Sequence, residues 1–250
     1  GKDVRARVVG EGGNLGFTQL GRIEYARNEG RINTDFIDNS AGVDTSDHEV
    51  NLKILLGLAI TRGELTLEER NELLEQCAED VVGHVLYDNY LQAQILSQEM
   101  VVSAQRIESY EELMAQLVAD GELDREVEYL PSPEEMQQRR GDGIGMVRPE
   151  LAVLLAYAKR AIAFELLDSD VPDSPYLAKD LERYFPPKVV ERFGHLIPEH
   201  PLRRELVATI AANDVVNSQG ITFVSRMMTE TGARASQAVR AFRIARDVTD

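Results

Sequence analysis

Residues 8–51 read VVGEGGNLGFTQLGRIEYARNEGRINTDFIDNSAGVDTSDHEVN, and this stretch decides the fold class that the sequence predicts. A valine-rich run ends at Val9 in a cluster of glycines. Residues 18–28 then show the spacing of a helix, and residues 32–37 form a second β-prone run. The order is strand, loop, helix, strand, loop, helix, so we predict a parallel βαβ unit at the N-terminus.

Two residues mark the predicted helix boundaries in this stretch. Gly30 is placed to end the first helix by adopting a positive φ. Ser46 and Glu49 form an S-x-x-E capping box, which predicts that the next helix begins after Ser46. The Ser46 hydroxyl and the free N–H groups of that helix end would then suit a carboxylate.

Both predicted loops follow the carboxyl ends of strands, where open parallel sheets bind ligands. Gly12 and Gly13 lack a Cβ and let a ring or a sugar approach the main chain, while the Asn14 amide can both donate and accept. Asn39 offers the same chemistry in the second loop. Spacing alone favours a structural interpretation, in which the glycines and Asn39 make turns and Ser46 only caps a helix.

The motifs EGGN (11–14) and DNSAGVDTS (38–46) together resemble the second half of the nucleotide-binding domain of glutamate dehydrogenases. In that family an E-G-A-N loop and an N-A-G-G-V-x-x-S loop meet over the nicotinamide and the amino acid. The small hexameric enzymes differ, because Gly13 stands for their alanine, residues 15–17 replace a P-T-T run and Ala41 replaces a glycine. The chain is similar instead to the large NAD-specific glutamate dehydrogenases of bacteria, through SDHEVN (46–51) and residues 148–161, 200–209 and 217–227.

This resemblance implies an activity in amino-acid catabolism, the oxidation of L-glutamate to 2-oxoglutarate and ammonia with hydride transfer to NAD. It places Gly12, Gly13, Asn14 and Asn39 on the cofactor side, and Val43 and Ser46 on the substrate side, with Ser46 near the distal carboxylate of glutamate. The family's catalytic lysine and aspartate belong to an upstream domain, so no catalytic residue is assigned in this chain. A dehydrogenase for leucine or phenylalanine is disfavoured, because those enzymes need an apolar pocket where Ser46 stands.

The usual first turn of a dinucleotide-binding domain is missing. A G-x-G-x-x-G pattern from Gly10 would need a glycine at Leu15, and the chain has no initiating methionine. We therefore predict the C-terminal part of a longer polypeptide, inactive without its upstream part. Residues 1–62 would end a Rossmann-like NAD-binding catalytic domain, and residues 63–250 would form an all-α C-terminal domain. The predicted fold class is mainly α.

The pattern from about residue 64 onward is helical throughout. Thr66 and Glu69 form a capping box, and Pro149 starts a strongly apolar helix. The buried face of that helix is predicted to hold Leu151, Leu154, Leu155, Ala158, Ile162 and Leu166. This region supports an alternative function, a helical structural, regulatory or oligomerisation module without a cofactor site of its own. A homo-oligomer is expected in either case.

Composition excludes several classes of partner. The chain has 250 residues and a formal net charge of −16, which argues against binding to nucleic acid or to an anionic membrane surface. No apolar run approaches the roughly 20 residues of a membrane span. The single cysteine, Cys77, excludes an internal disulfide and a cysteine-based zinc site, so the cytoplasm is the expected compartment.

The histidines give no metal site from the sequence. His48-Glu49 opens an H-E-x-x-H pattern, but its second histidine position holds Leu52. His195 and His200 flank a proline in a turn-rich segment and are predicted to lie on the solvated surface. No metal ligand is therefore assigned.

Overall fold

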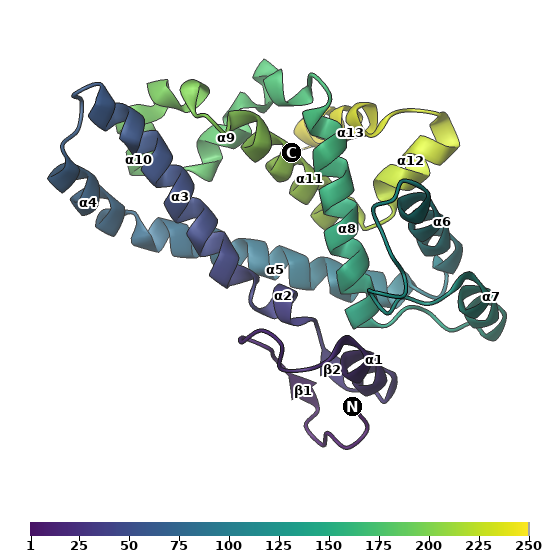
Figure 1. The fold of residues 1–250 in the computed structure, drawn as a ribbon. Coiled ribbons are helices and arrows are strands. Elements are labelled where there is room, and N and C mark those ends of the chain that lie inside the picture. The colour runs from purple at the N-terminus through teal and green to yellow at the C-terminus, as the bar shows by residue number, and fades with distance from the viewer. Residues whose placement is uncertain (250) are drawn as a thin grey trace. The chain divides into compact units, whose positions relative to one another are not determined.

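The computed structural model describes residues 1–249, and this part of the chain is mainly helical, with one small parallel sheet near the N-terminus (Figure 1). The predicted fold class, mainly α with an N-terminal parallel βαβ unit, is confirmed. Among the described helices, none is both long enough and apolar enough to span a membrane. The elements are β1 (Val8–Val9), α1 (Gln19–Arg27), β2 (Arg31–Ile32), α2 (Asp35–Asp38), α3 (Ser40–Thr61), α4 (Leu67–Gln76), α5 (Ala78–Val102), α6 (Ile107–Ala119), α7 (Pro133–Asp142), α8 (Arg148–Leu167), the 3₁₀ helices η1 (Val171–Asp173) and η2 (Pro175–Leu177), α9 (Ala178–Tyr184), α10 (Pro187–Phe193), η3 (Gly194–Glu199), α11 (Arg203–Gln219), α12 (Phe223–Thr231) and α13 (Ala235–Thr249).

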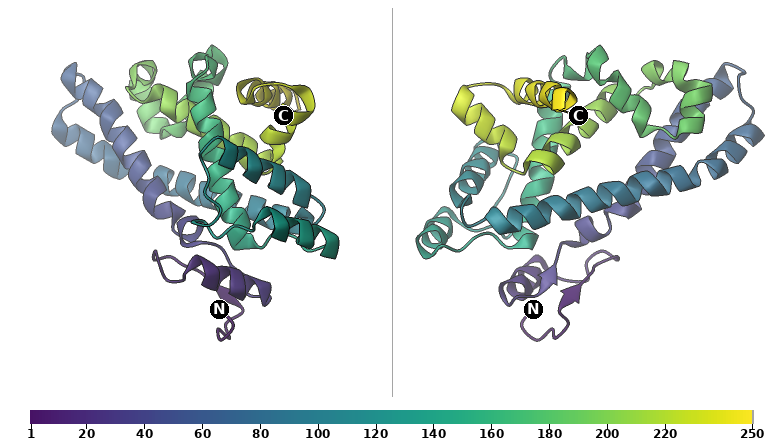
Figure 2. Two further views of the ribbon diagram at one scale, coloured as in Figure 1. Left: turned by 45° about the vertical axis from the view of Figure 1, so that its right-hand side comes forward. Right: turned by 180° about the vertical axis from the view of Figure 1, so that it is seen from behind.

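The βαβ unit consists of β1, α1 and β2, drawn in purple near the N-terminus in Figure 2. The strands pair in parallel, with Val8 opposite Arg31 and Val9 opposite Ile32. Thr18 caps α1, since its hydroxyl accepts an N–H from the first turn of the helix. The loops after β1 and β2 therefore both start from the carboxyl ends of neighbouring strands, as predicted.

The second strand is shorter than predicted. It ends at Ile32, and residues 35–38 form the helical turn α2 instead of the rest of a strand. The reason lies in Asp35 and Asp38, which are poor strand formers and whose carboxylates accept main-chain N–H groups from the loop after β1.

The predicted role of Gly30 in ending α1 by a positive φ is wrong. The positive φ lies one residue earlier, at Glu29, where it is 66°. Gly30 is needed for space, because a Cβ at this position would lie 2.4 Å from ring atoms of Tyr25. The Tyr25 hydroxyl in turn donates to the Ala6 carbonyl at 2.5 Å and closes the unit at its N-terminal end.

Two local predictions in the helical region are confirmed. The Thr66 hydroxyl accepts the Glu69 N–H at 3.2 Å and the Glu69 carboxylate accepts the Thr66 N–H at 2.8 Å, so the capping box is complete. The helix near Pro149 is α8, and its predicted apolar face is buried at all six positions: Leu151, Leu154, Leu155, Ala158, Ile162 and Leu166.

The chain forms two compact units, each built from separated segments. One unit comprises Gly1–Asn39, Leu91–Ile162 and the chain from Ala212 onward, and we call it the βαβ-containing unit. The other comprises Ser40–Tyr90 and Ala163–Ala211, and we call it the α3 unit. The residues predicted on the cofactor side lie in the first unit, and Val43 and Ser46 lie in the second.

Candidate functional site

A buried ion pair closes the loop that follows β1. Glu11 at the start of the loop is 5% exposed, and both of its carboxylate oxygens bind the Arg22 guanidinium of α1, at 2.6 and 2.9 Å. The same carboxylate accepts the Phe17 N–H at the end of the loop, at 2.9 Å. Residues 12–16 are thereby held as an exposed loop between two fixed ends.

The loop is also fixed to α2, the turn that follows β2. Asp38 accepts the Glu11 N–H and Asp35 accepts the Leu15 N–H, each at 2.8 Å. An Asp35 carboxylate oxygen also lies 3.2 Å from the Arg22 guanidinium, which therefore pairs with two carboxylates, those of Glu11 and Asp35. Leu15 has a φ of 64°, a conformation that costs energy in a residue with a branched side chain, and the bond to Asp35 holds it there.

The pKa of Asp35 reflects this environment. Burial by itself would raise the pKa of the carboxyl, but the Leu15 N–H and the Arg22 charge outweigh burial and lower it. The hydrogen bonding that Arg22 donates to Glu11 is the largest influence on Arg22 and raises the pKa of its guanidinium. Both groups are therefore charged at neutral pH, and the anchor of the loop is ionic.

The two asparagines predicted on the cofactor side are in direct contact. The Asn39 side-chain nitrogen donates to the Asn14 side-chain oxygen at 3.0 Å. Asn14 lies in the exposed loop after β1, and Asn39 is the C-cap of α2 after β2. The prediction that the two loops meet is confirmed. Within the described residues, the other two side-chain atoms of the pair, the Asn14 nitrogen and the Asn39 oxygen, take part in no side-chain hydrogen bond.

Gly12 and Gly13 lie beside this pair on the exposed loop. A Cβ added at either position would have no heavy atom within 4 Å, and neither residue has a positive φ. The fold therefore does not require glycine here, whereas an approaching ligand would meet bare main chain.

Ser46 does not begin a helix. The helix α3 starts six residues earlier, at Ser40, so the predicted N-cap role of Ser46 is wrong. The Ser46 hydroxyl donates to the Gly42 carbonyl at 3.1 Å, the contact that serine makes within a helix. Residues 40–45 joined the helix because no residue among them stops it. Val43 and Ser46 are both exposed, three positions apart on α3.

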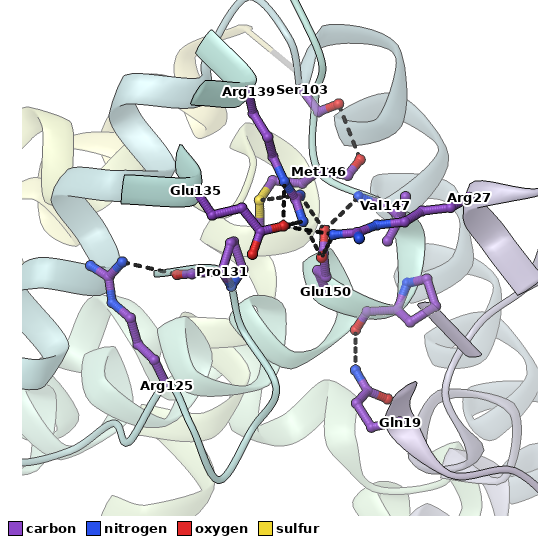
Figure 3. Close-up of polar contacts among 11 residues, drawn as sticks. Gln19, Arg27, Ser103, Arg125, Pro131, Glu135, Arg139, Met146, Val147 and Glu150 are labelled. Atoms are coloured by element: carbon purple, nitrogen blue, oxygen red, sulfur yellow. Dashed lines mark hydrogen bonds and ion pairs between the residues drawn. The ribbon is translucent and has the colours of Figure 1, made fainter. Parts of the chain in front are cut away.

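A second polar network joins the βαβ unit to α7 and α8 of the same compact unit (Figure 3). The Glu150 carboxylate, 1% exposed, accepts two hydrogen bonds of 2.8 Å from Arg139, and Arg27 of α1 reaches it at 3.5 Å. Beside it, the Gln19 side chain donates to the Pro149 carbonyl at 3.1 Å. This network positions α1, and with it the loop that α1 anchors.

A pocket of about 570 Å³ lies beside the two strands. Its lining includes Val9, Asn33, Met100 and Arg148, but neither Asn14 nor Asn39. The asparagine pair, with Asn14 exposed and Asn39 half-buried, is therefore no part of this pocket.

Family models match the two ends of the chain. The model described as "Bacterial NAD-glutamate dehydrogenase, catalytic domain" matches residues 1–99, and the model described as "Glutamate dehydrogenase, C-terminal" matches residues 143–250. The chain belongs to the bacterial NAD-glutamate dehydrogenase family. The resemblance carried by EGGN and DNSAGVDTS is thereby confirmed.

Relatives in this family align with nearly the whole chain. Proteins named "NAD-specific glutamate dehydrogenase" are 48% identical over 247 residues in Halomonas elongata, 48% over 248 residues in Pseudomonas aeruginosa and 44% over 239 residues in Mycobacterium tuberculosis. These alignments cover 99%, 99% and 96% of the chain. The chain spans 15% of the length of each relative.

Sequence reasoning missed the residues that hold the glutamate dehydrogenase motif in place. Glu11, Asp35 and Asp38 are charged residues in or next to short turns that contain glycine or asparagine, and that was the available signal, whereas Arg22 lies within the helix α1 and gave none. It also missed the burial of His200, predicted on the surface, which is 3% exposed with a ring nitrogen 3.2 Å from the Asn51 carbonyl. His195 is exposed, as predicted, beside Glu64.

Proposed function

We propose that this chain is part of an NAD-dependent glutamate dehydrogenase, which oxidises L-glutamate to 2-oxoglutarate and ammonia. The names of the relatives support this activity, and their greater length supports an upstream part of the same polypeptide. The observation that carries the proposal is the 3.0 Å hydrogen bond between Asn39 and Asn14, which joins two loops at the carboxyl ends of parallel strands. The unit would then be the end of a Rossmann-like domain.

The asparagine pair suits the carboxamide of nicotinamide. A primary carboxamide has one donor group and one acceptor group, and the pair keeps the Asn14 nitrogen as a donor and the Asn39 oxygen as an acceptor. Gly12 and Gly13 leave open space beside them. NAD, when bound, supplies the hydride acceptor, and the asparagines would orient its ring.

Val43 and Ser46 are proposed to contact the substrate from the exposed face of α3. Residues three apart lie on one side of a helix, so a single ligand can touch both. The Ser46 hydroxyl can rotate away from the Gly42 carbonyl and donate to a carboxylate. Val43, 66% exposed, would pack against the methylenes of glutamate.

Replacing Ser46 with alanine in the native polypeptide should raise the KM for glutamate about tenfold, because a hydrogen bond to a charged group contributes roughly 1.5–3 kcal/mol. Steady-state kinetics with varied glutamate measure this. Thr45→Val is the matched control, since Thr45 is exposed on the same helix and its hydroxyl donates to the Ala41 carbonyl. An equal KM in Ser46→Ala and the unchanged protein would remove Ser46 from the substrate site.

Turnover assays test the proposed function itself. The native polypeptide should form NADH from glutamate and NAD, whereas residues 1–250 alone should form none, because the family's catalytic lysine and aspartate are expected upstream. NADH absorbance measures both. A native polypeptide that leaves glutamate unchanged would overturn the proposed function. Turnover by residues 1–250 alone would show that the catalytic residues do not lie in an upstream part.

The remaining proposals concern the setting of this activity. We place the protein in the cytoplasm, which the buried free thiol of Cys77 supports. We divide the chain at residues 1–62 and 63–250, although the match to the catalytic domain extends to residue 99. A homo-oligomer is supported by an exposed apolar stripe on α5, formed by Val82, Leu86 and Tyr90 at helical spacing. The solution mass of the native polypeptide tests the oligomer.

A further inference from the structure

Three side chains that can bind a metal ion converge in the α3 unit. Asp44 and His48 lie four residues apart on α3, and Asp88 lies on α5. One ligand atom from each residue lies within 4.8 Å of the ligand atoms of the other two. Residues four apart share one face of a helix, so α3 offers two ligands towards the same point and α5 offers the third.

The His48 imidazole lacks the hydrogen bonds that a buried polar ring needs. The residue is 2% exposed. Its Nε2 faces Asp44 Oδ1 at 3.8 Å, beyond hydrogen-bond distance, and its Nδ1 is buried without a partner among the described residues. Burying a polar ring without partners is unfavourable, and an ion bound at Nε2, the nitrogen that faces Asp44, would supply one of the two missing interactions.

The ring is held in a fixed orientation. Tyr184 stacks on His48 with ring centroids 4.3 Å apart and an angle of 15° between the planes. The Tyr184 hydroxyl accepts a hydrogen bond from the Asn51 side chain at 3.0 Å, which fixes the tyrosine in turn. The imidazole is therefore held with its Nε2 facing Asp44.

We propose that Asp44, His48 and Asp88 bind a divalent transition-metal ion of the Zn²⁺ type. Ligand atoms bound to one Zn²⁺ at about 2.0–2.2 Å lie roughly 3–4 Å apart, and the His48–Asp44 distance of 3.8 Å falls in that range. One imidazole and two carboxylates neutralise the ion and suit Zn²⁺ better than Mg²⁺ or Ca²⁺, which prefer oxygen ligands.

The proposed ion would cross-link α3 and α5 and leave coordination positions for water. The ring centroid of His84 lies 5.5 Å from that of His48. We do not include His84 among the proposed ligands. His84 and Asp88 are four residues apart on α5, so they repeat on that helix the spacing of Asp44 and His48 on α3. This inference does not depend on the proposed dehydrogenase activity.

Zn²⁺ binding to the native polypeptide tests the site. The protein is stripped with a chelator, and Zn²⁺ affinity is measured by competition with a chromophoric chelator, together with bound zinc by mass spectrometry. His48→Gln, Asp44→Asn and Asp88→Asn should each lose one bound equivalent or bind it at least about 100-fold more weakly, because loss of even an outer-shell partner costs roughly 10- to 100-fold. Substituted Co²⁺ should show a visible spectrum that His48→Gln changes.

Asp47→Asn is the matched control, because it removes the same charge from an exposed position on the same helix. It should bind Zn²⁺ like the unchanged protein. Circular dichroism shows whether His48→Gln folds. If it does not, Asp88→Asn serves as the test variant, because the change is nearly isosteric and Asp88 is only half-buried. Equal Zn²⁺ affinity in Asp88→Asn, Asp47→Asn and the unchanged protein would overturn the proposal.

Discussion

Replacing Arg22 with methionine should lower the free energy of unfolding of the βαβ unit by about 3–5 kcal/mol, the effect of removing one partner from a buried ion pair. The side chains of Arg22, Glu11 and Asp35 are only 7%, 3% and 12% exposed. Without the guanidinium, two carboxylates remain buried close to one another with no cation. The Glu11 carboxylate, which accepts the Phe17 N–H, would lose its own anchor, so both ends of the loop of residues 12–16 would be held less firmly.

Hydrogen exchange of residues 8–39 in the native polypeptide measures this effect, and NADH titration measures its functional consequence. Arg31→Met is the matched control, since Arg31 is exposed on β2 and should change stability by less than about 0.5 kcal/mol. Equal protection of residues 8–39 in Arg22→Met and Arg31→Met would show that the ion cluster does not hold the loop.

Replacing Glu150 with methionine should destabilise the βαβ-containing unit by about 3–5 kcal/mol for the same physical reason. The change leaves the buried Arg139 without its bidentate partner, and it leaves the Val147 N–H without its acceptor at 2.9 Å (Figure 3). Urea unfolding followed by hydrogen exchange of α7 and α8 measures the loss.

Glu135→Met separates burial from charge in this experiment. Glu135 binds the same Arg139 at 2.7 Å, but its side chain is 42% exposed, so its loss should cost no more than about 1 kcal/mol. If the two glutamate variants proved equally stable, the burial of Glu150 would have no energetic role.

The sequence predicts the elements whose signals are local. The Thr66–Glu69 pair caps its helix through bonds that span three residues, and α8 shows its apolar face within a single helix. The sequence fails where the decisive partner is distant. The turn α2 depends on N–H groups 20 and 27 residues away, and His200 is buried by a contact with Asn51, 149 residues away.

The candidate site divides in the same way. The resemblance placed Asn14 and Asn39 at one ligand, and parallel strand topology brings them together. Neither showed that Glu11 and Arg22 would anchor the loop, because an ion pair across a loop and a helix has no sequence periodicity. The capping signal at Ser46 was misleading, since the helix continues backward to Ser40 without a stop.

Affinity for NADH in asparagine variants of the native polypeptide tests the central proposal most directly. Fluorescence titration gives the Kd for the unchanged protein, Asn14→Ala, Asn39→Ala, the double variant and the exposed control Asn71→Ala. Each single change at the pair should raise the Kd about tenfold, since one hydrogen bond contributes about 1.5 kcal/mol. The double change should raise the Kd less than the product of the two, because the residues act as a bonded pair. A Kd equal to that of Asn71→Ala in both single variants would contradict a nicotinamide site at these loops.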